Sequence, residues 1–131
     1  MKAFKPLSSL LLMIFLTVFS ISCRNDNNDN NPSGGNYPKK VSTTYKVTST
    51  TATSANLIQY KNETGANIDV PNPTLPFTKT FDRIVNKGDV LTVGYGTNTS
   101  QIVKIEILVN NVVVKSQEFS STSGALVYLF E

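Results

Sequence analysis

Histidine and tryptophan are absent from the 131-residue sequence, and cysteine occurs once, at Cys23. A single cysteine excludes an internal disulfide, and without histidine there is no Ser–His or Cys–His pair for nucleophilic catalysis. A zinc site built from cysteine and histidine is excluded for the same reason. We therefore expect no catalytic residue, no cofactor-binding residue and no metal ligand in this chain.

A large excess of positive charge is also lacking. The 12 lysine and arginine residues exceed the 9 acidic residues by 3, but Lys2 and Lys5 lie in an N-terminal segment that we expect to be removed. The remaining basic residues are scattered, and only Lys39 and Lys40 are adjacent. Because binding to a phosphate backbone needs a cluster of basic side chains, nucleic acid is not an expected partner.

The N-terminus has the pattern of a secretory signal peptide. Lys2 and Lys5 form a positively charged start, and a mainly apolar stretch follows from Leu7 to Ile21. This stretch is shorter than the ~20 residues that a membrane-spanning helix needs. We predict a cleaved signal peptide over residues 1–22, and the alternative is an uncleaved membrane anchor.

The motif Ser20-Ile21-Ser22-Cys23 ends this segment. It resembles the lipobox of bacterial lipoproteins, in which a small residue precedes the cysteine. The resemblance implies that the Cys23 thiol receives a diacylglyceryl group, that the leader is cleaved before Cys23, and that the new amine is acylated. Ser20 departs from the leucine that this family usually has. The alternative is ordinary secretion with a free thiol.

Lipid at Cys23 would decide where the protein resides, because two or three acyl chains hold a protein stably on a membrane. We expect attachment to the cell envelope, at the outer membrane of a Gram-negative bacterium. The periplasmic face and the surface face of that membrane are the two alternatives. The residues that follow, up to Lys40, are rich in asparagine and aspartate and have no large apolar residue before Tyr37. We predict a disordered tether over residues 23–40, with a reach on the order of 20–25 Å. It is either a passive spacer or a sorting signal for export.

The composition changes at Val41, where threonine, valine, isoleucine and tyrosine become frequent and turn residues recur at short intervals. This pattern predicts a domain over residues 41–131 with about seven short strands. The fold class we predict is all-β, as a single immunoglobulin-like β-sandwich, and an up-and-down barrel is the alternative. The expected strands are Ser42–Thr50, Asn56–Lys61, Asn67–Val70, Thr78–Val85, Leu91–Tyr95, Ile102–Phe119 as a hairpin, and Ala125–Phe130.

The hairpin is the strongest local signal. Asparagine tolerates positive φ, so Asn110-Asn111 fits a two-residue turn between two valine-rich strands. That turn would pair Val109 with Val112, Leu108 with Val113, and Ile107 with Val114, with a bend or bulge before Phe119. Elsewhere, Ser120–Gly124 is expected to be a loop. The proline-rich stretch Pro71–Pro76 is expected to be an edge or crossover loop rather than a central strand.

Several short motifs resemble the soluble domain of the MmpS family in the same order. They are Ile58-Gln59-Tyr60-Lys61-Asn62-Glu63-Thr64-Gly65, Leu75-Pro76-Phe77-Thr78-Lys79 and Ile107-Leu108-Val109-Asn110-Asn111. The resemblance implies a β-sandwich outside the inner membrane that assists a large transporter. This chain departs from the family because a lipid anchor would replace the transmembrane helix and because the domain has no cysteine.

These observations favour a non-catalytic binding or interaction module with an envelope protein or transporter as partner. The alternative is a lipid- or glycan-handling protein, either a carrier or a hydrolase with an unrecognised site. The acidic residues Glu63 with Asp69, and Asp82 with Asp89, are better explained as solvated side chains than as catalytic pairs. A cavity lined by Leu75, Phe77, Phe81 and Tyr95 would favour lipid carriage, whereas a filled core with an exposed edge strand would favour protein interaction.

Overall fold

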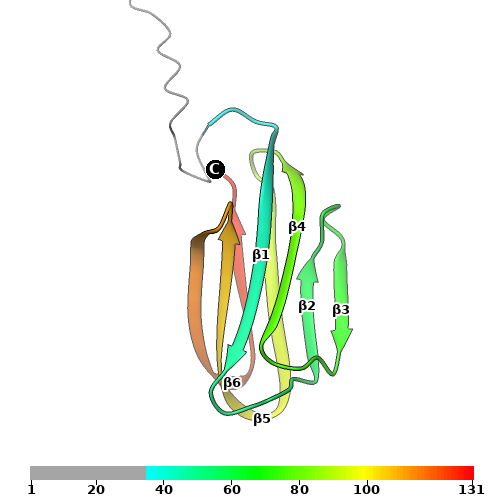
Figure 1. Ribbon diagram of the computed structural model, residues 1–131, viewed down its shortest axis with the longest axis vertical. Helices are drawn as coiled ribbons and strands as arrows, with labels where there is room; N and C mark the ends of the chain where they lie inside the picture. The colour runs from blue at the N-terminus through cyan, green and yellow to red at the C-terminus, as the bar shows by residue number, and fades with distance from the viewer. Residues whose placement is uncertain (1–34) are drawn as a thin grey trace, which may run out of the picture.

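The computed structural model describes residues 35–131 of the chain, which form an all-β fold without a helix. The expected all-β, sandwich-like fold is thus confirmed. Six strands are present within these residues (Figure 1). They are β1 (Lys39–Ser49), β2 (Leu57–Lys61), β3 (Asn67–Pro71), β4 (Phe77–Val85), β5 (Val90–Val109) and β6 (Val112–Leu129).

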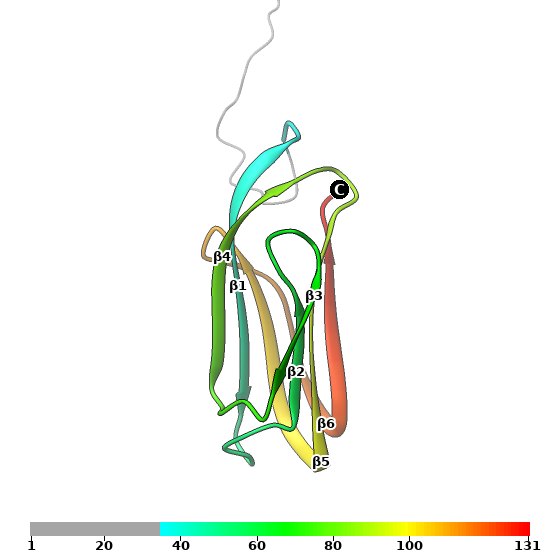
Figure 2. The same ribbon diagram turned by 90° about the vertical axis from the view of Figure 1, so that its right-hand side faces the viewer.

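The strands belong to one antiparallel sheet that folds over on itself. The order is β3-β2-β5-β1-β4, and β6 pairs with the other side of β5. The first part of β5 pairs with β2, from Val93 to Gly96, and its last part pairs with β1, from Val103 to Val109. The sheet therefore has two halves, which lie face to face in Figure 2. We call them half A (β3, β2, the start of β5 and the end of β6) and half B (β4, β1, the end of β5 and the start of β6).

The core lies between the two halves and follows the alternation of each strand. On β1, Tyr45 and Val47 are completely buried, as the sequence pattern predicts. Ile58 and Tyr60 point inward from β2. The Tyr45 and Tyr60 rings meet across the core with centroids 5.7 Å apart. On the last strand, Leu126 and not Val127 faces the core, which decides between the two alternatives that the sequence left open.

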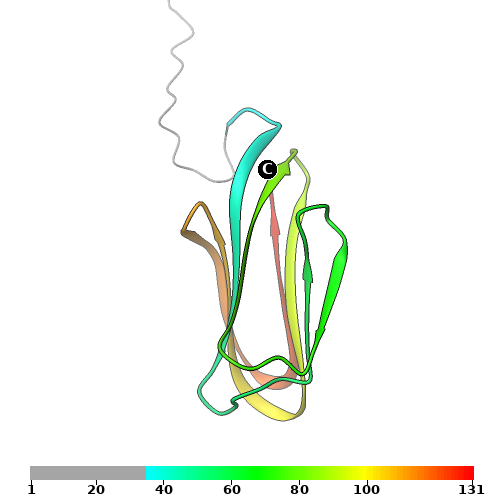
Figure 3. The same ribbon diagram turned by 45° about the vertical axis from the view of Figure 1, so that its right-hand side comes forward.

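The number and lengths of the strands differ from the prediction of about seven short ones. Residues 96–101 and 120–124 were expected to interrupt strands, but β5 and β6 run through both stretches as a long bent hairpin (Figure 3). A register shift between Gly96 and Gln101 marks the bend. Hydroxyl-rich residues resemble a loop in sequence. At this exposed bend Ser120, Ser121 and Ser123 still pair with β5 through the backbone, and the Thr97 hydroxyl donates to the Thr122 carbonyl.

The turn at Asn110-Asn111 is confirmed, and both residues have positive φ, of 51° and 64°. Val109 pairs with Val112 and Leu108 with Val113, as expected. The predicted pairing of Ile107 with Val114 is wrong, because Ile107 pairs with Lys115. Val114 is the extra residue of a β-bulge at this point. The expected bulge therefore exists, but it lies directly after the turn.

The remaining connections match their predicted roles. Pro71 ends the edge strand β3, and residues 72–76 cross from half A to β4 in half B. Leu75 and Phe77 pack against the core. The first strand begins at Lys39, so the ordered domain starts two residues before the predicted boundary at Val41.

Candidate functional site

Cys23, the predicted lipidation site, lies outside the described residues, as do the predicted signal peptide and most of the predicted tether. The chain enters the described domain near its C-terminus. The Tyr37 hydroxyl donates a hydrogen bond to the backbone carbonyl of Glu131, with an O–O distance of 3.1 Å. The Lys39 ammonium lies over the Tyr37 ring, 4.7 Å from its centroid. We call this end of the molecule the entry end, and the opposite end the distal end.

The candidate carboxylates interact with neighbouring strands rather than with one another. The Gln59 amide donates to Asp69, with an N–O distance of 2.7 Å. Asp82 pairs with Lys40 at 3.1 Å, and both side chains are more than half exposed. Asp89 lies 3.6 Å from the Arg83 guanidinium. Among residues 35–131, no group of three or more histidine, cysteine or acidic side chains gathers in a metal-binding arrangement.

The tyrosines follow the expectation of buried rings with hydroxyls at the rim. Tyr45 donates to the Lys61 carbonyl at 2.9 Å and Tyr95 to the Ser121 carbonyl at 3.0 Å. Burial raises the pKa of the Tyr45 hydroxyl above its ordinary value. Partial desolvation lowers the pKa of the Lys39 ammonium. The Tyr45 and Tyr95 rings are buried parts of the fold, so neither is a candidate for stacking on a ligand.

Of the four residues named for a lipid cavity, the three aromatic ones make ring contacts, and Leu75 packs against the core. Phe81 lies against Tyr45 with ring centroids 5.7 Å apart, and Phe77 lies against Tyr60 at 6.2 Å. Tyr95 packs on Phe119 from the other half of the sheet, at 6.0 Å. The aromatic rings thus fill the space between the two halves, and Tyr95 is in a different contact from Phe77 and Phe81.

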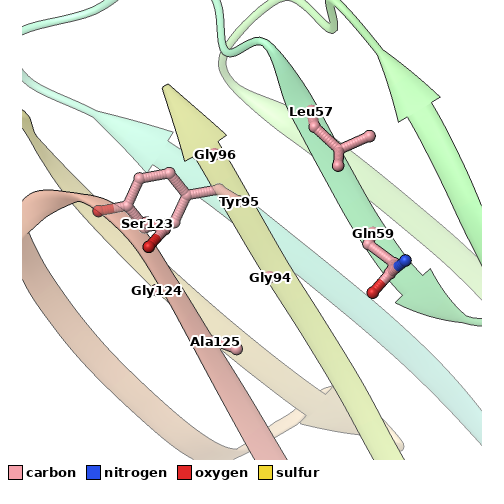
Figure 4. A pocket seen from close by; sticks show the side chains of 8 residues that line it. All are labelled: Leu57, Gln59, Gly94, Tyr95, Gly96, Ser123, Gly124 and Ala125. Carbon is pink, nitrogen blue, oxygen red and sulfur yellow. The ribbon is translucent and has the colours of Figure 1, made fainter. Parts of the chain in front are cut away.

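A shallow groove crosses the outer face of half A, towards the distal end (Figure 4). Its volume is about 480 Å³. Gly94 and Gly96 form its floor, because two glycines at alternate positions leave the same face of β5 without side chains. We call it the glycine groove. Its lining residues are Leu57, Gln59, Gly94, Tyr95, Gly96, Ser123, Gly124 and Ala125.

Two of the glycines have different packing roles. A Cβ on Gly94 would lie 3.1 Å from the Gly124 carbonyl oxygen and 3.2 Å from the Ala125 Cβ, so a side chain there is tightly restricted. A Cβ on Gly96 would meet no heavy atom within 4 Å. Gly96 therefore keeps the groove open without being required by packing. The Gly94-Tyr95-Gly96 sequence does not fit a phosphate loop. The sequence signal for the groove is the alternation of two glycines within a strand, which sequence reasoning missed.

One wall of the glycine groove is the free edge of the sheet. Among the described strands, β6 pairs only with β5, so its other edge has backbone groups directed away from the sheet. From Phe119 to Phe130 this strand and its end contain neither a charged residue nor a proline. Proteins commonly protect edge strands with charges, proline or bulges. The part of β6 beside the groove has neither a charge nor a proline, and its pairing is irregular only at the bend, opposite Gly96 and Gln101.

The other sheet edges differ. The edge strand β3 is only five residues long and ends at Pro71. The edge strand β4 contains Lys79, Asp82 and Arg83. The first part of β6 contains the Val114 bulge, Lys115 and Glu118. The stretch of β6 from Ser121 to Ala125, beside the glycine groove, is therefore the edge best suited to accept another strand or an extended ligand.

No protein family and no curated protein matches this sequence. Within residues 35–131 there is also no helix long and apolar enough to cross a membrane. The candidate site thus consists of an uncharged groove beside a sheet edge that carries neither charge nor proline.

Proposed function

We propose that this chain is a non-catalytic binding module of the bacterial cell envelope, anchored by lipid at Cys23. The observation that carries the binding role is the glycine groove beside the unprotected edge of β6, over a core filled with aromatic rings. The sequence before the domain supports the anchor, since a lipobox-like motif follows an apolar leader. We place the protein at the outer membrane of a Gram-negative bacterium.

The partner that we propose is an envelope protein, such as a transporter. An extended segment of the partner would add to β6 at residues 121–125 through backbone hydrogen bonds, and its side chains would reach the glycine groove. Since the groove lining is uncharged, a neutral segment with small apolar side chains fits best. The motifs resembling the MmpS family and the two-layered β fold support a transporter as the class of partner.

A second candidate is the binding of a neutral glycan in the same groove. The observation that favours it is the combination of the exposed Gln59 side chain with the hydroxyl of Ser123 at an uncharged surface. Lipid carriage has less support, because Phe77 and Phe81 pack against core tyrosines rather than around an empty space.

The test is crosslinked recovery of the full-length, membrane-bound protein from its own envelope. Ala125→Lys places a charge between the free edge and the groove, and we expect it to reduce partner recovery at least about tenfold, the effect of roughly 1.4 kcal/mol. Ser116→Lys is the matched control, because it puts the same charge on the same strand in half B. Equal recovery by wild type and Ala125→Lys would refute this binding site. Recovery of glycans alone would favour the second candidate.

The anchor has its own test. Cys23→Ala should abolish incorporation of labelled fatty acid and release the protein from membranes, because Cys23 is the sole thiol in the sequence. Cys23→Ser is a closer match in size and should behave identically if the thiol is what reacts. Unchanged membrane attachment in both variants would refute lipidation as the means of anchoring.

A further inference from the structure

Apolar side chains are exposed on β6 towards the entry end, beyond the glycine groove. Four of the large exposed apolar residues among the described ones belong to β6, near its two ends. Val112 and Val113 are 48% and 49% exposed at its start, and Val127 and Leu129 are 51% and 46% exposed at its finish. Isolated apolar residues are common on protein surfaces, but several on one strand indicate a contact.

The two ends of β6 face one another across a groove of about 330 Å³, which we call the β6 groove. It lies where the start of β6 in half B and its finish in half A flank the open side of the folded sheet. The lining residues are Val114, Lys115, Val127, Tyr128, Leu129 and Glu131. The groove thus combines aliphatic side chains, a tyrosine, a lysine and an acidic C-terminal residue.

The chain enters the domain beside this groove. Glu131, which lines the β6 groove, accepts the hydrogen bond from Tyr37. Lys39 lies near both Tyr37 and Phe130. Tyr37 follows Cys23 by 14 positions, so even a fully extended chain could not place the two more than about 50 Å apart. A lipid at Cys23 would hold the entry end close to the membrane surface.

We infer that the β6 side of the entry end rests on the lipid bilayer. This inference depends on the lipid anchor of the proposed function and adds a second membrane contact. Valine and leucine side chains enter the boundary between headgroups and acyl chains, where amphipathic tyrosine rings also reside. Lys39 and Lys115 lie at the level of the lipid phosphates, with their aliphatic stems along the apolar surface. The Glu131 side chain adds a negative charge to the same groove, so the apolar side chains dominate the contact.

This contact would set the orientation of the domain. The glycine groove and the β6 edge beside it, residues 121–125, lie nearer the distal end, and they would face away from the membrane. The anchor alone would leave the domain free to rotate about its connection. Apolar contact at the β6 groove would restrict that rotation and present the binding edge to a partner.

The absence of tryptophan from the sequence permits a direct test. Val127→Trp in the full-length, lipidated protein is reconstituted into vesicles of phosphatidylethanolamine and phosphatidylglycerol with brominated acyl chains. We expect a blue-shifted emission that bromine quenches at least twofold. Ile102→Trp is the matched control, because Ile102 is also an exposed apolar strand residue, at 37%, but lies at the distal end. Its emission should be unquenched.

Val113→Trp provides a second reporter, from half B, if Val127→Trp does not fold. A fatty-acid-labelled protein whose tryptophans at 113 and 127 are both unquenched would overturn this inference and leave the proposed anchor intact. A blue shift without quenching, together with a crosslinked dimer, would show that a second copy covers the β6 groove and would also overturn it. Fatty-acid labelling at Cys23 is measured on the same sample. A failure of the lipid anchor is thereby distinguished from a failure of the bilayer contact.

Discussion

Thr43 and Thr44 are neighbours on β1 whose hydroxyl groups differ in their surroundings. The Thr43 hydroxyl is completely buried and has no hydrogen-bond partner among residues 35–131. The Thr44 hydroxyl lies 2.9 Å from that of Thr80 on β4. An unpaired buried hydroxyl costs free energy that a methyl group of similar shape does not.

We therefore expect Thr43→Val to raise the free energy of unfolding by about 1 kcal/mol, and Thr44→Val to lower it by about 0.5–1.5 kcal/mol. Urea denaturation of the Cys23→Ala form, which avoids detergent, measures both. Because the two residues are adjacent and the substitutions identical, each is the control for the other. A loss of stability in both variants would mean that the Thr43 hydroxyl has a partner in solution.

Gly124 is required by the packing of an aromatic ring. A Cβ at this position would lie 2.6 Å from two atoms of the Phe119 ring. That ring also contacts Tyr95, so it has little room to move. We expect Gly124→Ala to lower the free energy of unfolding by about 1–3 kcal/mol, the usual cost of overpacking. Gly96→Ala, at an open position, should change it by less than about 0.5 kcal/mol. Equal losses in urea denaturation would contradict this account.

Tyr45 gives the fold a dependence on alkaline pH. Burial raises the pKa of its hydroxyl above the ordinary value of 10.0, so the unfolded chain loses this proton at lower pH than the folded chain. The contribution of Tyr45 to stability is complete below pH 10 and declines as the pH rises further. The decline is at most about 1.4 kcal/mol per pH unit. Tyr45→Phe should show a shallower decline than wild type between pH 10 and 12. If the free energy of unfolding, measured with urea, declines equally with pH in wild type and Tyr45→Phe, this role of Tyr45 is refuted.

At the scale of elements, strands with alternating apolar residues were predictable, whereas the continuation of strands through polar segments was not. Tyr45 and Val47 reveal the inward face of β1 because they alternate with polar residues. Residues 97–101 and 120–123 contain only threonine, serine, asparagine and glutamine, a composition that fits a loop and a solvated ribbon equally well. The pairing of Ile107 with Val114 was predicted wrongly for a related reason, since three successive valines allow more than one register.

The candidate site was predictable only in part, because sequence shows single residues but not which distant strands pair. Its glycines were visible in the sequence, but their role depends on Leu57 and Ala125 lying on either side of them. Those neighbours come from β2 and from the far end of β6, and only the pairing of distant strands brings them together. Of the features set against a lipid cavity, the structure shows an edge strand, β6, and ring contacts made by Phe77, Phe81 and Tyr95.

The position of each strand in the sheet predicts how its amide hydrogens exchange. β1 and β5 have paired strands on both sides, whereas β6 is paired on one side only. In antiparallel pairing, alternate amides of an edge strand point away from the sheet. We expect slow exchange where both sides are paired, at residues 43–47 of β1 and 93–96 and 103–109 of β5, and fast exchange at alternate positions of β6. Hydrogen-exchange NMR on the Cys23→Ala form would show this pattern. Uniform protection of β6 would mean that another chain already covers its edge.

At the scale of the whole molecule, the two halves of the sheet share their longest strands. The start of β5 and the end of β6 belong to half A, and the other parts of the same two strands belong to half B. Their inner faces also share one core, as the contact of Tyr95 in half A with Phe119 in half B illustrates. Neither half can lose its pairing without disturbing the backbone of the other. We therefore predict that the domain unfolds as one cooperative unit.

Single tryptophans can test this prediction, since the natural sequence has none. Tyr128→Trp reports on half A and Phe77→Trp on half B, and both positions are only partly buried. In urea, each variant should give the same midpoint by tryptophan fluorescence and by circular dichroism, which monitors all strands together. A midpoint that differs between the two methods within one variant would show that its half unfolds separately. Comparison within a variant removes the effect of the substitution itself on stability, so the outcome depends only on whether the shared hairpin couples the two halves.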